Sequence, residues 1–194
     1  MTGVRRFAQW GLWFGGALVL LAAVLIGIDV LMRKFLVLSI GGADELAGYA
    51  LAIGTAWGLG ATLLDRAHIR IDSLYVLFPQ KLRLTLDVLA IVLLLAFFAL
   101  LTWHGLGVLA QSWTSGSRSQ SALETPTVIP QVLWIAGLVA FIAVGVLLLL
   151  RALTVVASGD LRGAARLIST RSAEEEVEDE IRDLKDRRER EGSA

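Results

Sequence analysis

Hydrophobic residues occur in four long blocks along the chain, and polar residues gather between them. The blocks at 10–28, 46–64, 88–107 and 130–150 contain no Asp, Glu, Lys or Arg. A helix needs about 20 apolar residues to cross a bilayer, because each residue adds about 1.5 Å of rise to a hydrocarbon layer of about 30 Å. The pattern predicts four transmembrane helices, at about 10–31, 46–64, 84–107 and 130–150.

The composition agrees with this prediction. Of the 194 residues, 56% are hydrophobic and 19% are charged, which is more apolar than soluble domains usually are. Because backbone groups in lipid must be satisfied internally, we predict an all-α integral membrane protein. Lys plus Arg and Asp plus Glu both total 18, so the net charge does not indicate a nucleic-acid partner. The absence of Cys excludes disulfides and thiolate metal sites.

The positive charges predict the orientation in the membrane. Counted on alternate sides of the four spans, Lys and Arg number ten on the side of both termini and three on the other. The ten are Arg5, Arg6, Arg66, Arg70, Lys81, Arg83, Arg151, Arg162, Arg166 and Arg171, and the three are Arg33, Lys34 and Arg118. Basic residues favour the cytoplasmic side, so both termini are predicted to be cytoplasmic.

The tryptophans and the flanks of the first block support this topology. Trp10 and Trp13 fall at the inner end of the first span, as expected for a membrane-interface belt. The first block is expected to remain as a span rather than to be cleaved as a signal peptide. It is long for such a peptide, and Met32, Arg33 and Lys34 follow it in place of small residues.

The connecting segments have distinct characters. Residues 65–83 are too polar to span and too apolar for free solution, which predicts a short interfacial helix between the second and third spans. Asp72 or Ser73 is expected to cap it, and Pro79 to end it and open the third span. Residues 111–125 form a predicted Ser-rich outer loop, and Pro130 suits the first turn of the fourth span.

The chain divides into two parts by composition. Residues 1–156 are predicted to form the transmembrane domain, and 157–194 a charged cytoplasmic tail. Within the tail, oppositely charged residues at i, i+4 spacing predict a helix over 174–191. A solvated helix and a partner-binding helix are both compatible with its narrow apolar stripe.

Ionisable residues close to the spans have two possible explanations. Asp29 lies four residues before Arg33, and Asp87 four residues after Arg83, so each pair is predicted to form an ion pair along its helix. A proton relay through Asp29 is the alternative, since ionisable residues in membranes often mark ion paths.

The remaining polar residues indicate no chemistry. Asp44 and Glu45 open the second span, where carboxylates favour the positive end of the helix dipole and Asp44 is a candidate cap. His68 and His104 are predicted at opposite membrane surfaces, too far apart to share a haem or metal ion. Because nucleophile, metal and phosphate-binding motifs are also missing, we expect neither enzymatic activity nor a cofactor.

Small residues recur at helix-packing spacing. They are Gly11 and Gly15 in the first span, Ala50, Gly54 and Gly58 in the second, and Ala136 and Ala140 in the fourth. Such ridges let helix backbones approach closely. The neighbour can be a helix of this chain or a larger partner, and the sequence does not distinguish the two.

Several short motifs occur in a characteristic order. Arg33, Lys34 and Phe35 leave the first span, and Asp44, Glu45 and Leu46 open the second. After Gly60 come His68, Ile69, Arg70, Ile71 and Asp72, and the fourth span is entered through Thr125, Pro126 and Pro130. In these features the segment 33–134 resembles the small membrane subunit, or Q subunit, of tripartite ATP-independent periplasmic (TRAP) transporters. It departs from the family in two ways. Gly41, Gly42 and Ala43 stand where a Trp is common shortly before the acidic pair, and the charged tail is long.

The resemblance implies an accessory role. In that family a large transmembrane subunit moves an organic acid with sodium, and a periplasmic substrate-binding protein captures the acid. The small subunit braces the assembly in the bacterial inner (cytoplasmic) membrane. Its expected partners are therefore the large subunit, the binding protein and membrane lipid, with no nucleic acid. The candidate partner interface comprises Arg33, Glu45, Ala50, Gly54, Gly58, His68, Asp72, Pro126 and Pro130.

Two other functions stay open as alternatives. A self-sufficient small multi-span transporter would need a carboxylate in mid-span to couple ions, and none of the four blocks contains one. A membrane anchor subunit of a redox complex would need paired histidines facing each other within the bilayer.

Overall fold

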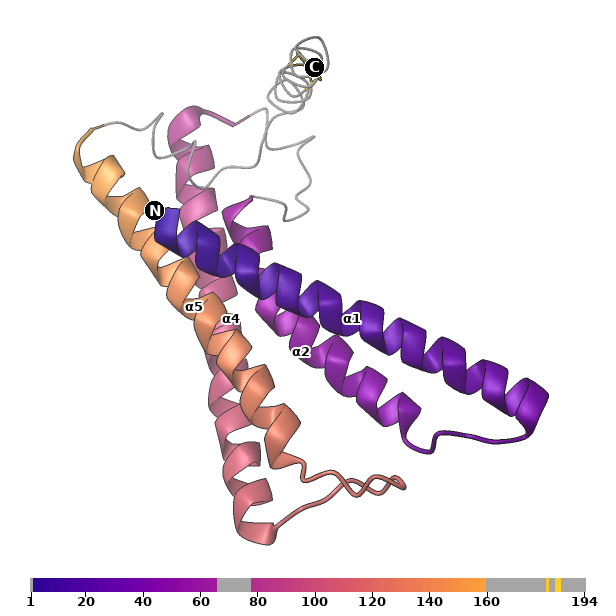
Figure 1. Ribbon diagram of the computed structural model, residues 1–194. Coiled ribbons are helices and arrows are strands. Elements are labelled where there is room, and N and C mark those ends of the chain that lie inside the picture. The colour runs from indigo at the N-terminus through magenta and orange to yellow at the C-terminus, as the bar shows by residue number, and fades with distance from the viewer. Residues whose placement is uncertain (1, 66–77, 160–180, 182–183, 186–194) are drawn as a thin grey trace.

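The structure is a computed structural model that describes residues 2–65, 78–159, 181 and 184–185. These residues form four helices, namely α1 (Thr2–Leu36), α2 (Ala43–Leu64), α4 (Gln80–Ser115) and α5 (Val128–Ala157) (Figure 1). Each helix is long and apolar enough to cross a membrane, which confirms the predicted all-α fold with four spans. The predicted interfacial helix lies almost wholly outside the described residues, as does the predicted tail helix over 174–191.

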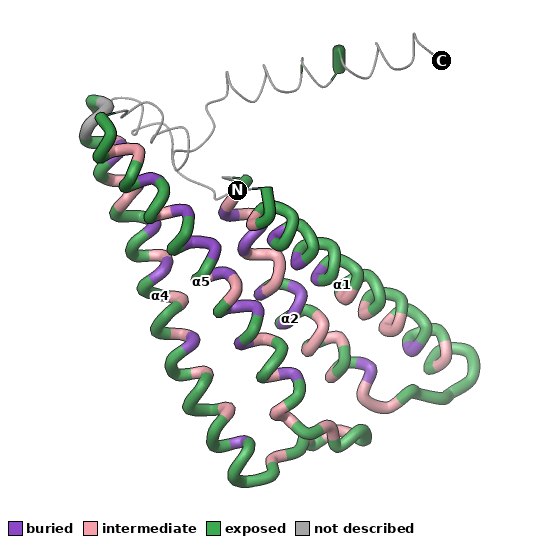
Figure 2. The backbone as a smooth tube through the Cα atoms, turned by 60° about the vertical axis from the view of Figure 1, so that its left-hand side comes forward, coloured by how far each residue is buried: buried purple, intermediate pink, exposed green. Residues whose placement is uncertain are grey.

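The helices are arranged as two antiparallel hairpins. Helices α1 and α2 form the first hairpin, α4 and α5 form the second, and α2 packs against α5 to join them. We call the end with the 37–42 turn and the 116–127 loop the loop end, and the opposite end the terminal end. Toward the loop end the two hairpins spread apart (Figures 1 and 2).

The main hydrophobic core lies toward the terminal end, where the hairpins meet. It contains Leu63 of α2, three residues of α4 and three of α5, which are Leu84, Ile91, Leu95, Phe141, Leu148 and Ala152. The rings of Phe98 and Phe141 meet edge to face at 4.7 Å between centroids. In this core, large side chains interlock, so its stability depends on their volume.

All four helices extend beyond their predicted spans, α1 and α4 by the most residues. Helix α1 begins at Thr2, so Arg5 and Arg6 are helical, and Arg5 pairs with Asp65 at 3.7 Å. Helix α4 begins after its N-cap, Pro79, and runs through Ser115. In the last turn of this helix, the Ser115 hydroxyl donates to the Gln111 carbonyl four residues earlier. The Ser-rich connection is therefore 116–127, shorter than the predicted 111–125.

The prediction that Asp44 caps the second span is wrong. The N-cap is Gly42, which has a φ of 92° and provides no side-chain hydrogen bond. Asp44 instead lies within the first turn, where its charge still complements the helix dipole. Glycine at 42 permits a left-handed conformation that side-chain-bearing residues rarely adopt.

The predicted ridge of Ala136 and Ala140 is not the packing face of α5. Ala136 is exposed and Ala140 is half-buried, whereas Gly137 and Gly145 are buried. A Cβ atom at Gly137 would lie 2.9 Å from the Ala56 side chain. The small residues that let α5 approach its neighbours are therefore the glycines.

Much of the outward surface of α1 and α4 is exposed (Figure 2), and many of the exposed side chains there are large and apolar. Exposed side chains include Leu20 at 69%, Phe97 at 61% and Trp103 at 73%. In a membrane protein such surfaces contact lipid tails or other membrane helices.

Candidate functional site

The loop between α4 and α5 is an ordered ribbon. Gly116 ends α4 with a φ of 60°, and an isolated antiparallel bridge then pairs Arg118 with Pro126. The Ser119 amide donates to the Thr125 carbonyl at 2.9 Å. These contacts fold residues 117–127 back on themselves, so the ribbon projects from the second hairpin as a unit.

The tip of this ribbon rests on the turn of the first hairpin. A Cβ atom at Gly42 would lie 2.6 Å from two atoms of the Leu123 side chain, and one at Gly41 would lie 3.4 Å from Ala122. Both glycines have positive φ, 62° at Gly41 and 92° at Gly42. Glycine is thus required here both for the turn conformation and for the close approach of the ribbon.

Glu45 binds the ribbon through its carboxylate. The Ser119 hydroxyl donates to Glu45 Oε2 at 2.7 Å, and the Ser121 hydroxyl donates to the same oxygen. Glu45 Oε1 is buried and has no hydrogen-bond partner among the described residues. We call the ribbon 117–127, the turn 37–42 and Glu45 together the clasp, because they connect the two hairpins where these spread apart.

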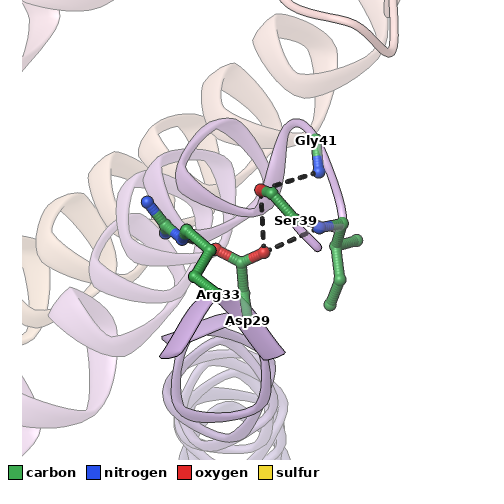
Figure 3. Close-up of polar contacts among 5 residues, drawn as sticks. Asp29, Arg33, Ser39 and Gly41 are labelled. Carbon is green, nitrogen blue, oxygen red and sulfur yellow. Dashed lines mark hydrogen bonds and ion pairs between the residues drawn. The ribbon is translucent and has the colours of Figure 1, made fainter. Parts of the chain in front are cut away.

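The turn itself is fixed by Asp29, which is 1% exposed. Figure 3 shows its polar contacts with Arg33 and Ser39. Asp29 Oδ1 accepts hydrogen bonds from the Ser39 hydroxyl at 3.0 Å and from the Ile40 amide at 2.7 Å. Arg33 forms an ion pair with Asp29 Oδ2, which confirms the predicted i, i+4 pair. With both oxygens engaged, the Asp29 carboxylate is a structural anchor for the turn rather than an open proton carrier.

A further polar contact connects the helices of the second hairpin near the clasp. Gln131 Nε2 donates to the Ser112 hydroxyl at 3.0 Å, between α5 and α4. Pro130, one position earlier, is buried in the first turn of α5, the place predicted from the sequence. This contact fixes the base of the ribbon.

The predicted interface residues fall into three groups. Arg33, Glu45, Pro126 and Pro130 all lie at the loop end, in or beside the clasp. Ala50, Gly54 and Gly58 lie along α2. His68 and Asp72 lie outside the described residues. The structure therefore brings the first group together, and the role of each residue toward a partner stays a prediction.

The α2 ridge faces a helix of the same chain. A Cβ atom at Gly54 would lie 2.8 Å from the Gly15 carbonyl oxygen, and one at Gly11 would lie 2.7 Å from the Trp57 carbonyl oxygen. The backbones of α1 and α2 are thus in direct contact. This favours the intramolecular explanation of Gly54, whereas Gly58 makes only an ordinary contact with Leu12, at 3.7 Å.

Other candidate residues show no reactive arrangement. Asp87 in α4 is fully buried. The Arg83 guanidinium donates to the Phe78 carbonyl at 2.6 Å. The ion pair between Arg83 and Asp87 stays a prediction. His104 is exposed. Within the described ranges, His, Asp and Glu form no group of three or more that could hold a metal ion.

Comparison with protein families decides the identity of this architecture. The family model of the DctQ component of tripartite ATP-independent periplasmic transporters matches residues 9–155, which include nearly all of the four helices. The chain belongs to this family. It is therefore a TRAP transporter small subunit, a multi-pass membrane protein of a transporter family rather than of an enzyme family. Neither a curated protein nor a solved structure matches it.

Sequence reasoning missed most of the clasp. Glu45 was singled out, but its partners Ser119 and Ser121 lie more than 70 positions away, at separations of 74 and 76. Neither serine carries a local signal that would point to α2. The pair of glycines at 41–42 was the available signal, because adjacent glycines mark a turn that another segment can approach closely.

Proposed function

We propose that this DctQ-family chain is an accessory permease subunit, which braces the large membrane subunit of a sodium-coupled, binding-protein-dependent importer of organic acids. Its site is the bacterial inner membrane. The loop end faces the periplasm, where the substrate-binding protein arrives, and the termini lie in the cytoplasm. Residues 1–156 supply the membrane frame, and 157–194 form a cytoplasmic tail.

The observation that carries this proposal is that the carboxylates at the loop end hold parts of this chain together. Asp29 and Glu45 both bind groups of this chain, and their contacts fix a turn and join two hairpins. In a carrier, carboxylates within the membrane mark the path of the transported ion. These two instead maintain one geometry, which suits a frame.

The exposed apolar faces provide the surface that such a frame needs. Helices α1 and α4 present many large hydrophobic side chains outward, including Leu21 at 66% and Leu93 at 59% exposure. Helix association in a membrane relies on packing contacts over such faces. These faces are therefore where a large helical subunit would dock.

Co-purification tests the proposal. The tagged full chain is co-expressed with the large membrane subunit of its transporter, and the membranes are solubilised in mild detergent. The large subunit is expected to elute with the tagged chain in constant ratio. Separate elution of two well-folded subunits would contradict the proposal.

Labelling tests the orientation in the same membranes, because the natural chain has no cysteine. Gln120 on the ribbon and Gly3 at the start of α1 are both exposed. In spheroplasts an impermeant thiol reagent is expected to label Gln120→Cys and to spare Gly3→Cys until the membrane is opened. The opposite pattern would invert the topology.

A further inference from the structure

A shallow depression lies on the outer surface of α1 near the terminal end. Its lining residues are Arg6, Gln9, Trp10 and Trp13, and its volume is about 320 Å³. Trp10 and Trp13 are 76% and 78% exposed, so the two indole rings stand away from the bundle. A cation, an amide and two aromatic rings therefore share one concave surface.

This surface points away from the rest of the described chain. Residues of a helix are offset by about 100° each, so Arg6, Gln9, Trp10 and Trp13 share one side of α1. Gly11 and Gly15, which contact α2, lie on the opposite side. The depression therefore faces the surroundings of the bundle.

The Arg6 guanidinium is available for an external anion. Its sequence neighbour Arg5 pairs with Asp65, but Arg6 forms no ion pair with a described carboxylate. From Arg6 to Trp13 the helix rises by about 10 Å, which is enough to run from the headgroup layer into the acyl chains. Arginine, amide and indole N–H groups donate hydrogen bonds to phosphate oxygens, while indole faces suit hydrocarbon.

We propose that this depression binds an anionic phospholipid of the leaflet at the terminal end. The lipid phosphate binds Arg6 and Gln9, and the upper part of an acyl chain lies along Trp10 and Trp13. The choice of a lipid rests on charge complementarity and on depth, since anionic headgroups and a lone cation meet at the membrane surface beside interfacial aromatic rings. This site is independent of the proposed accessory function.

Fluorescence quenching by brominated lipid tests the proposal. The full chain is reconstituted in phosphatidylcholine vesicles containing a minor fraction of either brominated phosphatidylglycerol or brominated phosphatidylcholine. Brominated phosphatidylglycerol is expected to reach half-maximal quenching of tryptophan at a roughly fivefold lower lipid fraction than brominated phosphatidylcholine. One basic residue near an anionic surface contributes an affinity difference of about this size. Trp10→Phe combined with Trp13→Phe should remove this difference.

Matched arginine variants separate the site from general surface charge. Arg6→Gln is expected to abolish the preference for phosphatidylglycerol and Arg6→Lys to retain most of it. Arg5→Gln, which removes the same charge one position away, should leave it nearly unchanged. Circular dichroism and elution volume identify any misfolded variant, and for the natural chain raised salt should weaken the preference independently.

Four results would overturn the assignment. Three are measured on this chain alone: equal quenching by the two brominated lipids, an equal loss of preference in Arg5→Gln and Arg6→Gln, and a preference that persists in the double tryptophan variant. If the preference disappears when the large subunit is co-reconstituted, that subunit covers the depression and the lipid is not its occupant.

Discussion

The two helices of the first hairpin pack together in a different way from the two helices of the second. In the first hairpin, α1 and α2 meet backbone to backbone at Gly15 and Gly54, with no side chains between them. In the second, α4 and α5 interlock through large side chains, such as Phe98 against Phe141. The α1–α2 contact therefore depends on the absence of side chains at the glycines, and the α4–α5 contact depends on the volume of large side chains.

The difference has a physical basis in the bilayer. Lipid tails are as apolar as Leu or Phe, so burying such residues between helices gives little hydrophobic stabilisation. Helix association in the bilayer therefore depends on van der Waals contacts between the helices. Close backbone approach and interlocked rings are two ways to obtain the same dispersion contacts. Added volume should damage the first hairpin, and removed volume the second.

The largest effect is expected from Gly54→Leu. Its Cβ alone would lie 2.8 Å from the Gly15 carbonyl oxygen, and backbone cannot rotate away as a side chain can. We expect a loss of about 3 kcal/mol or more of unfolding free energy, measured by denaturant titration in detergent micelles. Gly48→Leu is the control, because nothing lies within 4 Å of a Cβ at Gly48. Equal destabilisation by both variants would contradict the glycine crossing.

A smaller effect is expected from Phe141→Ala in the second hairpin. Phe141 is 1% exposed and packs against Phe98. In soluble cores such a change costs about 3–5 kcal/mol, but part of that is transfer to water, so we expect about 2 kcal/mol here. Phe97→Ala, at a 61% exposed neighbouring ring, should be nearly neutral in the same titration. Similar losses at both positions would remove the distinction between core and lipid face.

The clasp connects the two hairpins, and weakening it should change their separation more than their stability. For Glu45→Gln combined with Ser121→Ala, a double-mutant cycle should give a coupling of about 1 kcal/mol. Spin labels at the exposed positions Val37 and Gln120 should show a broader distance distribution in the double variant. An unchanged distribution would mean that helix packing alone sets the spread of the hairpins.

The smallest effect, with the opposite sign, is expected from Gly58→Ala. A Cβ at Gly58 would make an ordinary contact of 3.7 Å with Leu12. Alanine also restricts the unfolded chain, so a gain of about 0.5 kcal/mol is expected in the denaturant titration. A loss of unfolding free energy as large as that of Gly54→Leu would contradict this and would indicate that α1 also packs directly on the α2 backbone at Gly58.

The spans could be predicted from sequence because a run of about 20 apolar residues is a local property that suffices for insertion. The Asp29–Arg33 pair was equally local, four positions apart on one helix. Gly15 and Gly54 were singled out, but no local property shows that they face each other. The contacts of Glu45 with Ser119 and Ser121 arise only after both hairpins form.

Two of the predictions are wrong, for different reasons. Asp44 is a good capping residue, but Gly41 and Gly42 allow the chain to enter the helix two positions earlier. Ala136 and Ala140 have packing spacing, but the rotation of α5 against α2 places Gly137 at the contact. Helix rotation is set by tertiary packing, which spacing along one helix does not specify.

Reconstituted uptake tests most directly the claim that this chain is an accessory subunit. Proteoliposomes containing this chain alone, the large subunit alone, or both are given a sodium gradient and the loaded binding protein, and uptake of labelled organic acid is measured. We expect uptake only when both membrane subunits are present. Sodium-driven uptake by this chain alone, or full uptake by the large subunit alone, would contradict the claim.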